Sequence, residues 1–415
     1  MIGSLYSGIS GLKAQTSAMA VIGDNIANVN TTGFKTSKVR FANVFNATLG
    51  QSRMQIGRGV SMSGLSANWG AGTLESTNAV TDLAINGQGM FIVRDPSSNG
   101  QYYTRAGQFE FNSNHRLVTT DGFEVQGYNI DLNGNRGALG VITLPNGISQ
   151  PMQTTEITMG LNLNSEAAIG ETYDTTMSVY DSLGNSVELN FIFERTAAGW
   201  QWYVNPSRGD ASPAGAADPP DPLLDDYGLL EFDVNGALIA PAANPSISID
   251  NIGLGGDYPL VIDWLVLNEA GTASNGSVTG YAGSSVKTAQ TQDGYPSGML
   301  QGISVDNDGR FTALYSNGTM TSFAQVALAD FASYEGLAKQ GSNLFTSSLA
   351  SGQPVITTPN SAGVGAVASS SLEMSNVDLA QEFVSLITTQ RAFQANSKVI
   401  TTSDEVLAEL INIKR

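Results

Sequence analysis

The 415-residue chain contains no cysteine and a single histidine, His115. Without cysteine, disulfide bonds, thiol nucleophiles and Cys/His zinc sites are all excluded. Any histidine-based catalytic triad would have to use that one imidazole. The sequence therefore predicts no catalytic residue, no cofactor and no metal site.

Charged residues are also scarce and make up only 13% of the chain. Those present are mostly acidic, so the net charge is −18. Nucleic acids and anionic membranes are not expected as partners, since binding to phosphate needs Lys and Arg. The acid is concentrated in residues 151–285, which hold eighteen Asp and Glu against two Arg. This asymmetry predicts an inserted domain with a surface of its own.

No run of 18 apolar residues is present, so no membrane insertion is expected. Lys13 interrupts the first apolar stretch, which argues against a cleaved signal peptide. Two interpretations remain at this point: a cytosolic protein, or a protein exported without a cleaved signal.

What the chain does have is a heptad-like apolar seam near each end. At the N-terminal end, apolar residues alternate at spacings of three and four, which predicts a helix over residues 2–28. At the C-terminal end, large apolar residues recur every seven positions and predict a helix over 376–412, where Ser375–Asp378 resembles a capping box. The proposed seam residues are Ile2, Leu5, Ile9, Leu12, Met19, Ile26, Leu379, Phe383, Leu386, Phe393, Ile400, Leu407 and Leu410.

Pairing the two helices would hide one side of each but would leave flanking Val and Ile residues of the second helix exposed. One interpretation is a simple intramolecular helical hairpin. The preferred interpretation is a coiled coil of the two helices whose remaining apolar surface binds copies of itself, and repeated heterologous contacts of that kind build helical filaments.

The stretch GDNIANVNTTGFK, residues 23–35, follows the first helix and could be a catalytic loop or a structural stop. The stop is favoured, because Asn28 and Asn30 tolerate the left-handed conformation and Gly33 can supply a second reversal. The turn residues singled out here are Asn25, Asn28, Asn30, Gly33 and Phe34.

Between the ends, Asn-Gly and Asp-Gly pairs separate short apolar or alternating runs such as VELNFIF and WQWYV, which predicts antiparallel β structure. The expected fold is mixed α and β, with nested β domains between the paired helices. The expected parts are a helical domain (1–30 with 372–415), an extended linker region (31–75 with 356–371), a β domain (76–150 with 286–355) and the inserted acidic β domain (151–285).

Two segments resemble calcium loops only weakly. In VDNDGRF, counted from Asp306 as the first loop position, the glycine falls at the fourth position instead of the sixth. In DLNGNRG, Arg136 occupies the glycine position. Hairpin turns are the favoured interpretation of both. His115 is expected to lie in a turn between strands, with its side chain in solvent.

Several long motifs resemble the axial proteins of the bacterial flagellar rod and hook. They are GDNIANVNTTGFKTSKVRFANVF (23–45), DLAINGQGMFIVRDP (82–96), YTRAGQFEFNSNHRLVTTDGFEVQGY (103–128), GLAKQGSNLFTSS (336–348) and the segment 383–415. The resemblance covers roughly the first 130 and the last 80 residues; the acidic centre resembles no family. About 150 extra residues favour a hook-type member over a shorter distal rod or other axial subunit.

This resemblance implies a non-enzymatic subunit of a hollow helical tube, lined by paired terminal helices, that bends as a universal joint between motor and filament. It implies an extracellular location after export through the flagellar type III apparatus. It also implies contacts with the distal rod, the hook cap and the hook–filament junction proteins. A secreted β-rich adhesin or a glycan-active enzyme is the remote alternative.

Overall fold

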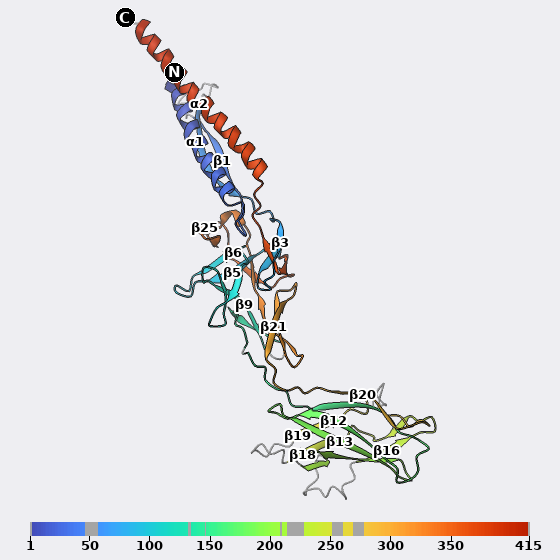
Figure 1. The fold of residues 1–415 in the computed structure, drawn as a ribbon. Coiled ribbons are helices and arrows are strands. Elements are labelled where there is room, and N and C mark those ends of the chain that lie inside the picture. Colours follow the sequence, from blue (N-terminus) through green and yellow to red (C-terminus); the bar gives the residue numbers. More distant parts are fainter. Residues whose placement is uncertain are drawn as a thin grey trace. The chain divides into compact units, whose positions relative to one another are not determined.

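The computed structural model describes residues 2–45, 57–131, 134–145, 147–207, 210–213, 228–250, 260–268 and 278–413. Within these residues, two long helices lie side by side, and the chain between them forms a series of mainly antiparallel strands (Figure 1). This confirms the expected mixed α and β fold. The chain divides into two compact units. Unit 1 comprises Met1–Pro145, Gly302–Leu314 and Met320–Arg415, and unit 2 comprises Asn146–Gln301 and Tyr315–Thr319.

The helices are α1 (Ile2–Ala27) and α2 (Leu379–Ile413), close to the predicted bounds. The start of α2 differs from the prediction, because Asp378 is the capping residue: its Oδ1 accepts hydrogen bonds from the backbone N of Ala380 (2.9 Å) and Gln381 (3.3 Å). Asn376 lies before the helix, and its side chain bonds to the backbone N of Thr36 and to the backbone O of Asn68.

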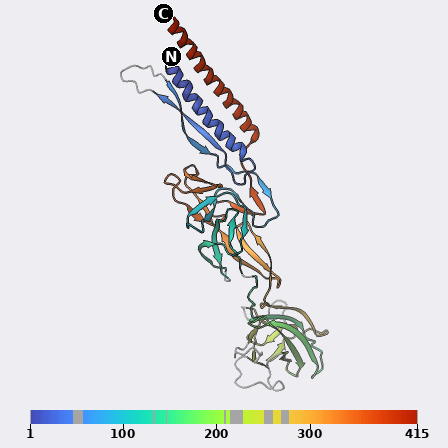
Figure 2. The same ribbon diagram turned by 60° about the vertical axis from the view of Figure 1, so that its left-hand side comes forward.

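The two helices run antiparallel, with Ser4 Oγ 3.2 Å from Ser403 Oγ near one end of the contact. On another side, α1 contacts a hairpin formed by β1 (Ser37–Phe45) and β2 (Gly57–Ala67). There the backbone N of Val60 donates to Ser10 Oγ at 3.2 Å. α1 therefore lies between α2 and the hairpin (Figure 2).

The β domain of unit 1 joins strands from both halves of the chain. They are β3 (Leu74–Ser76), β4 (Leu83–Asn86), β5 (Met90–Arg94), β6 (Gln101–Thr104), β7 (Phe109–Phe111), β8 (Leu117–Thr119), β9 (Glu124–Ile130), β10 (Arg136–Val141), β21 (Leu300–Val305), β22 (Arg310–Tyr315), β23 (Met320–Val326), β24 (Leu328–Asp330), β25 (Ala338–Gly341), β26 (Leu344–Thr346), β27 (Val355–Thr357), β28 (Ala366–Ser369) and β29 (Ser371–Glu373), with a 3-10 turn at Tyr334–Gly336. Strand β9 pairs with both β5 and β23, so the two sequence halves share one sheet.

The segment expected as an extended linker, 356–371, is instead part of the β structure. Strand β27 pairs with β24, and β28 pairs with β4 in the register Val367 to Ile85. Both of these side chains are buried, so the segment is held by packing as well as by its backbone hydrogen bonds. The segment carries few apolar residues, which favoured an extended linker, yet Val364 and Val367 among them are buried.

Unit 2 consists of two five-stranded sheets around one core. The sheets contain β11 (Glu156–Asn162), β12 (Thr172–Tyr180), β13 (Ser186–Arg195), β14 (Trp200–Pro206), β15 (Asp210–Pro213), β16 (Gly228–Phe232), β17 (Leu238–Ala240), β18 (Ser246–Asp250), β19 (Leu260–Trp264) and β20 (Val286–Gln292). Burial alternates along β13, and the rings of Trp202 and Trp264 meet edge to face at 4.9 Å in the core. Strand β20, expected in the neighbouring β domain, runs antiparallel to β11 and completes a sheet of unit 2.

One turn geometry recurs in the hairpins of both units. Among the described residues, an Asp Oδ1 accepts a hydrogen bond from the backbone N four residues later in the pairs Asp131–Asn135, Asp181–Asn185, Asp233–Ala237 and Asp306–Arg310. The residue before the donor is in each case a glycine with positive φ: Gly134, Gly184, Gly236 and Gly309. Both weak calcium-loop candidates, at Asp131 and Asp306, are therefore hairpin turns.

His115 occupies the glycine position of a fifth turn, in which the backbone N of Arg116 donates to Asn112 Oδ1 at 3.0 Å. Its φ is 58° and its side chain is exposed, as expected for a turn residue in solvent. The imidazole makes no contact that this geometry needs, and the left-handed backbone is more costly for histidine than for glycine, which has no Cβ.

We therefore expect His115→Gly to raise the free energy of unfolding by about 1 kcal/mol, because the left-handed strain is relieved at some cost in unfolded-chain entropy. Urea unfolding of both proteins measures the difference. His115→Ala serves as the control: it removes the imidazole, keeps the Cβ and should give no gain. Equal stabilisation by Ala and Gly would contradict the backbone explanation.

A second polar feature of the β domain is the buried carboxylate of Glu124. It accepts hydrogen bonds from Arg94 Nη2 at 2.9 Å and from Arg116 Nη1. Burial alone would raise the pKa of Glu124, but the hydrogen bonds and charges of the two guanidinium groups outweigh it and hold the pKa below the ordinary 4.5. The charged form is thus stabilised by folding.

Because the folded-state pKa is lowered, this contribution to stability is present above pH 4.5 and is lost as the pH falls through the lower folded value. We expect Glu124→Gln to reduce the free energy of unfolding by about 2 kcal/mol at pH 7. We also expect the variant to lose less stability than the wild type as the pH is lowered below 4.5. Urea unfolding at a series of pH values tests both points, and parallel pH profiles would refute the assignment.

Candidate functional site

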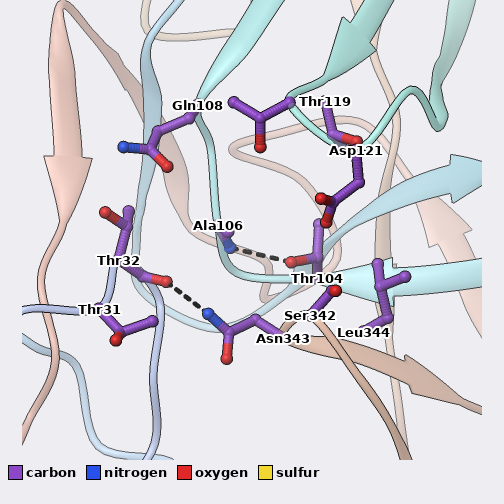
Figure 3. Close-up of a pocket in the computed structure, with 11 residues that line it drawn as sticks. Thr31, Thr32, Thr104, Ala106, Gln108, Thr119, Asp121, Ser342, Asn343 and Leu344 are labelled. Carbon is purple, nitrogen blue, oxygen red and sulfur yellow. Dashed lines mark hydrogen bonds between the residues drawn. The ribbon is translucent and has the colours of Figure 1, made fainter. Parts of the chain in front are cut away.

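A small pocket in unit 1 does not have the composition of an active site. It measures about 170 Å³ and is lined by hydroxyl and amide side chains, with Asp121 as the charged group. Two of the lining residues are joined by a hydrogen bond, in which Asn343 Nδ2 donates to the backbone O of Thr32 at 2.9 Å (Figure 3). No acid–base pair or nucleophile with a partner base meets there. Within the part of the chain that the structure describes, no cluster of three or more His, Cys, Asp or Glu could hold a metal ion.

The polar residues that do converge lie where α1 and α2 join the β domain. Asn25 is buried at the last turn of α1, and its side-chain amide makes two hydrogen bonds with the backbone of Ser37, donating to O at 2.9 Å and accepting from N at 3.0 Å. This pair fixes the direction in which the chain leaves the helix. Phe34, in the same connection, is also buried.

The conformation of the turn differs from the prediction at two of its asparagines. Gly33 has a left-handed φ of 70°, as expected, but Asn28 and Asn30 do not have positive φ. Asn28 acts through its side chain, since Nδ2 donates to the backbone O of Asp24 at 2.9 Å and Oδ1 accepts from Thr31 Oγ1 at 3.1 Å. A Cβ on Gly33 would lie 2.5 Å from the backbone N of Ala106, so close approach to the β domain requires glycine there.

Beyond the turn, three buried charges form one cluster. Oε1 of Glu373 accepts a hydrogen bond from Lys35 Nζ at 2.6 Å, and Oε2 accepts one from Arg105 Nη1 at 3.1 Å. The backbone N of Gly72 also donates to Oε1 at 2.9 Å. Burial lowers the pKa of Lys35, and the hydrogen bond from Lys35 to Glu373 opposes that shift. Sequence reasoning missed this cluster, because its members are scattered and follow no period.

The helix contact uses smaller residues than the predicted seam. The most buried positions of α1 are Gly8, Gly11, Ala14, Ala18, Ile22 and Asn25. A Cβ on Gly8 would lie 2.9 Å from Ile400 Cγ1, and one on Gly11 would lie 2.7 Å from Asn396 Oδ1. Since the backbones approach this closely, large side chains are displaced to the flanks of the contact.

Of the predicted seam residues, Leu5, Leu12, Met19, Ile26, Leu386, Phe393, Ile400 and Leu407 are partly exposed, and Ile9, Leu379 and Phe383 are exposed. The side chains of Ile2 and Leu410 lie outside the described set. The structure thus brings Ile400 to α1 but leaves Phe383 at 49% exposure.

A row of apolar side chains on α2 remains in solvent. Val384, Ile387, Val399 and Val406 are 56%, 57%, 42% and 50% exposed, as the flanking positions were expected to be. Tyr6 on α1 is 65% exposed. Large exposed apolar patches of this kind mark interaction surfaces. No described helix is both long enough and apolar enough to cross a membrane.

The close helix contact predicts opposite effects for two glycines of α1. Gly8→Leu should cost about 1–3 kcal/mol of stability through overpacking against Ile400. Gly23→Leu should give a gain of about 0.5–1 kcal/mol, because nothing lies within 4 Å of its Cβ and helix propensity improves. Urea unfolding followed by circular dichroism at 222 nm measures both, and a gain for Gly8→Leu would contradict the contact.

Models of flagellar protein families match most of the chain. Residues 5–35 match "Flagella basal body rod protein", and residues 84–162 match "Flagellar hook protein FlgE/F/G D1 domain". Residues 149–295 match "Flagellar basal body protein FlaE D2 domain", and residues 368–413 match "Flagellar basal body rod FlgEFG protein C-terminal". The acidic centre, which resembled no family by its motifs, therefore does match one.

Whole proteins match over their full length as well. The flagellar hook protein FlgE of Borreliella burgdorferi is 32% identical over 460 residues that cover 100% of both chains. The flagellar hook protein FlgE of Escherichia coli is 32% identical over 429 residues, covering 98% of each. The crystal structure of the Helicobacter pylori flagellar hook protein FlgE2 shares the fold, with a TM-score of 0.53 at 15% identity over 72% of this chain and 100% of that one. The chain therefore belongs to the flagellar hook protein family.

Proposed function

We propose that α1 and α2 pair as a coiled coil and that the apolar surface left exposed on them binds further copies of the same chain. As a member of its family, the chain is a structural subunit of the flagellar hook, external to the cell, and not an enzyme. The observation that carries the proposal is the exposed row on α2, which the contact with α1 does not cover.

The exposed surface extends beyond α2. On the hairpin, the cross-strand neighbours Phe41 and Met62 are 44% and 46% exposed, and Leu65 is 55% exposed. Each large apolar side chain that becomes fully buried contributes about 1.5–3 kcal/mol. The apolar surfaces of α2 and of the hairpin differ in shape, so a contact between two copies need not be isologous. Heterologous contacts that do not close produce a helical polymer.

In the proposed polymer, the paired helices line a hollow tube and the β domains form its outer layers. The assignment of the seam residues to subunit contacts belongs to this proposal. So does the division of the chain into parts, with the two bounds corrected above: 356–371 joins the β domain, and β20 belongs to the inserted domain. Weak, hydroxyl-rich contacts between outer domains would allow sliding, so that the tube bends as a universal joint while it transmits torque. The absence of cysteine suits unfolded passage through a type III export channel, because no disulfide bond can form to block it.

Contact with other flagellar components follows from membership of the hook family. The distal rod, the hook cap and the hook–filament junction proteins are the proposed partners at the two ends of the polymer. The apolar surfaces of α2 and of the hairpin that bind further copies would also bind these partners.

We expect the double variant Val384→Asn with Ile387→Asn to assemble poorly while its β domains stay folded. If assembly buries these side chains, the free energy with which a subunit of the variant joins the polymer is weaker by about 2 kcal/mol. The critical concentration for assembly then rises about 30-fold. Sedimentation and negative-stain electron microscopy of the purified protein measure it. Val234→Asn is the matched control, because Val234 is fully exposed in unit 2. Normal tubes from the double variant would contradict the proposed surface.

A further inference from the structure

The Glu373 cluster lies where both ends of the chain join the β domain. Glu373 ends β29, five residues before Asp378 caps α2, and Lys35 lies in the connection between α1 and β1. The Glu373 side chain is fully buried and those of Lys35 and Arg105 nearly so, with exposures of 0%, 1% and 4%. One carboxylate thus joins the segment that leaves α1 to the segment that enters α2.

The two cations also bind the backbone of the β domain. Lys35 Nζ donates to the backbone O of Gly70 at 2.8 Å, and Arg105 Nη2 donates to the backbone O of Gly87 at 2.8 Å. The backbone O of Glu373 accepts from the backbone N of Gly33 at 2.7 Å. Four segments far apart in sequence are therefore held by directional bonds around a single residue.

A neighbouring set of bonds repeats the connection. Asn376 Oδ1 accepts from the backbone N of Thr36 at 2.8 Å, and Asn376 Nδ2 donates to the backbone O of Asn68 at 2.8 Å. Lys339 Nζ, from β25, donates to Ser37 Oγ at 2.9 Å. Residues 32–37 are all buried, so packing as well as hydrogen bonds holds this part of the connection after α1.

Stability alone does not explain buried charges at this place. Replacing a buried ion pair by apolar residues of similar size is often neutral or stabilising, because both charges lose their hydration on burial. Charge-assisted hydrogen bonds differ from apolar contacts in being directional, so they select one arrangement of the groups that they join. Where two helices join the β domain, directional hydrogen bonds fix the orientation of the helices relative to that domain.

We propose that the Glu373 cluster is a rigid coupling that fixes both terminal helices to the β domain and prevents a hinge at residues 28–37 and 374–378. Force on the helices then passes directly into the β domain. The origin of that force rests on the proposed hook function, but the coupling itself is a property of each chain.

Hydrogen exchange measured by mass spectrometry on the full-length chain, as monomer and in assembled tubes, tests the coupling. In Glu373→Gln, one charge is removed with little change in shape. We expect exchange in the segments that hold Gly33 and Gly72 to become at least about tenfold faster, because local opening is no longer opposed by the ion pairs. Exchange in β5 should stay unchanged.

Glu335→Gln is the matched control. Glu335 accepts Arg40 Nη2 at 2.7 Å and links the hairpin to the β domain near the same place, but both side chains are more than half exposed. Its loss should leave exchange at Gly33 and Gly72 unchanged, since exposed ion pairs contribute little. Equal exchange in wild type and Glu373→Gln would overturn the coupling, as would equal acceleration by both variants.

The triple variant Lys35→Met, Arg105→Met, Glu373→Leu separates coupling from stability. We expect its thermal unfolding to resemble that of the wild type while the segments at Gly33 and Gly72 exchange faster. Wild-type protection in this variant would show that packing suffices and would overturn the proposal. Failure of the wild type to form tubes would contradict the hook function instead, and the monomer exchange would still decide the coupling.

Discussion

The architecture of unit 1 depends on bringing the two ends of a long chain to one place, and the Glu373 carboxylate is the group that they share. Its ion pair with Lys35 spans 338 residues, and that with Arg105 spans 268. Closing a loop of this length costs conformational entropy, which packing within the β domain of unit 1 offsets. The terminal helices can then pair in a defined position, since each begins or ends within a few residues of the cluster.

The helix pair itself is built in the opposite way to most buried helix contacts. Small residues, Gly8 and Gly11 among them, lie in the contact, and larger apolar residues such as Ile387 lie outside it. Because the two helix backbones approach closely, the larger apolar side chains stay outside the contact and remain available to bind other molecules. This arrangement would be a liability in a monomer, but it is suited to a subunit that gains its remaining burial from neighbours.

Unit 2 has little need of such support, because it holds a complete core of its own. Trp200, Trp202 and Trp264 are almost fully buried between its two sheets. Of the acidic residues in this segment whose side chains the structure describes, all but Asp181 are exposed or partly exposed, so they contribute to the surface of a self-sufficient sandwich. This independence explains how a large insertion can be accommodated between strands of unit 1 without disturbing them.

Local patterns in the sequence were enough to determine both helices, many of the strands and the Asp-Gly turns, because apolar periodicity and turn chemistry act over a few residues. The family was also identifiable from its motifs. Only the tertiary structure decided which face of α1 is buried, since Gly8 is favoured there by the proximity of Ile400 and not by its own hydrophobicity. It likewise decided that Asp378 caps α2 and that 356–371 forms strands. Above all, the cluster of Lys35, Arg105 and Glu373 could not be predicted, because single charges hundreds of residues apart have no period and meet only when the chain between them folds.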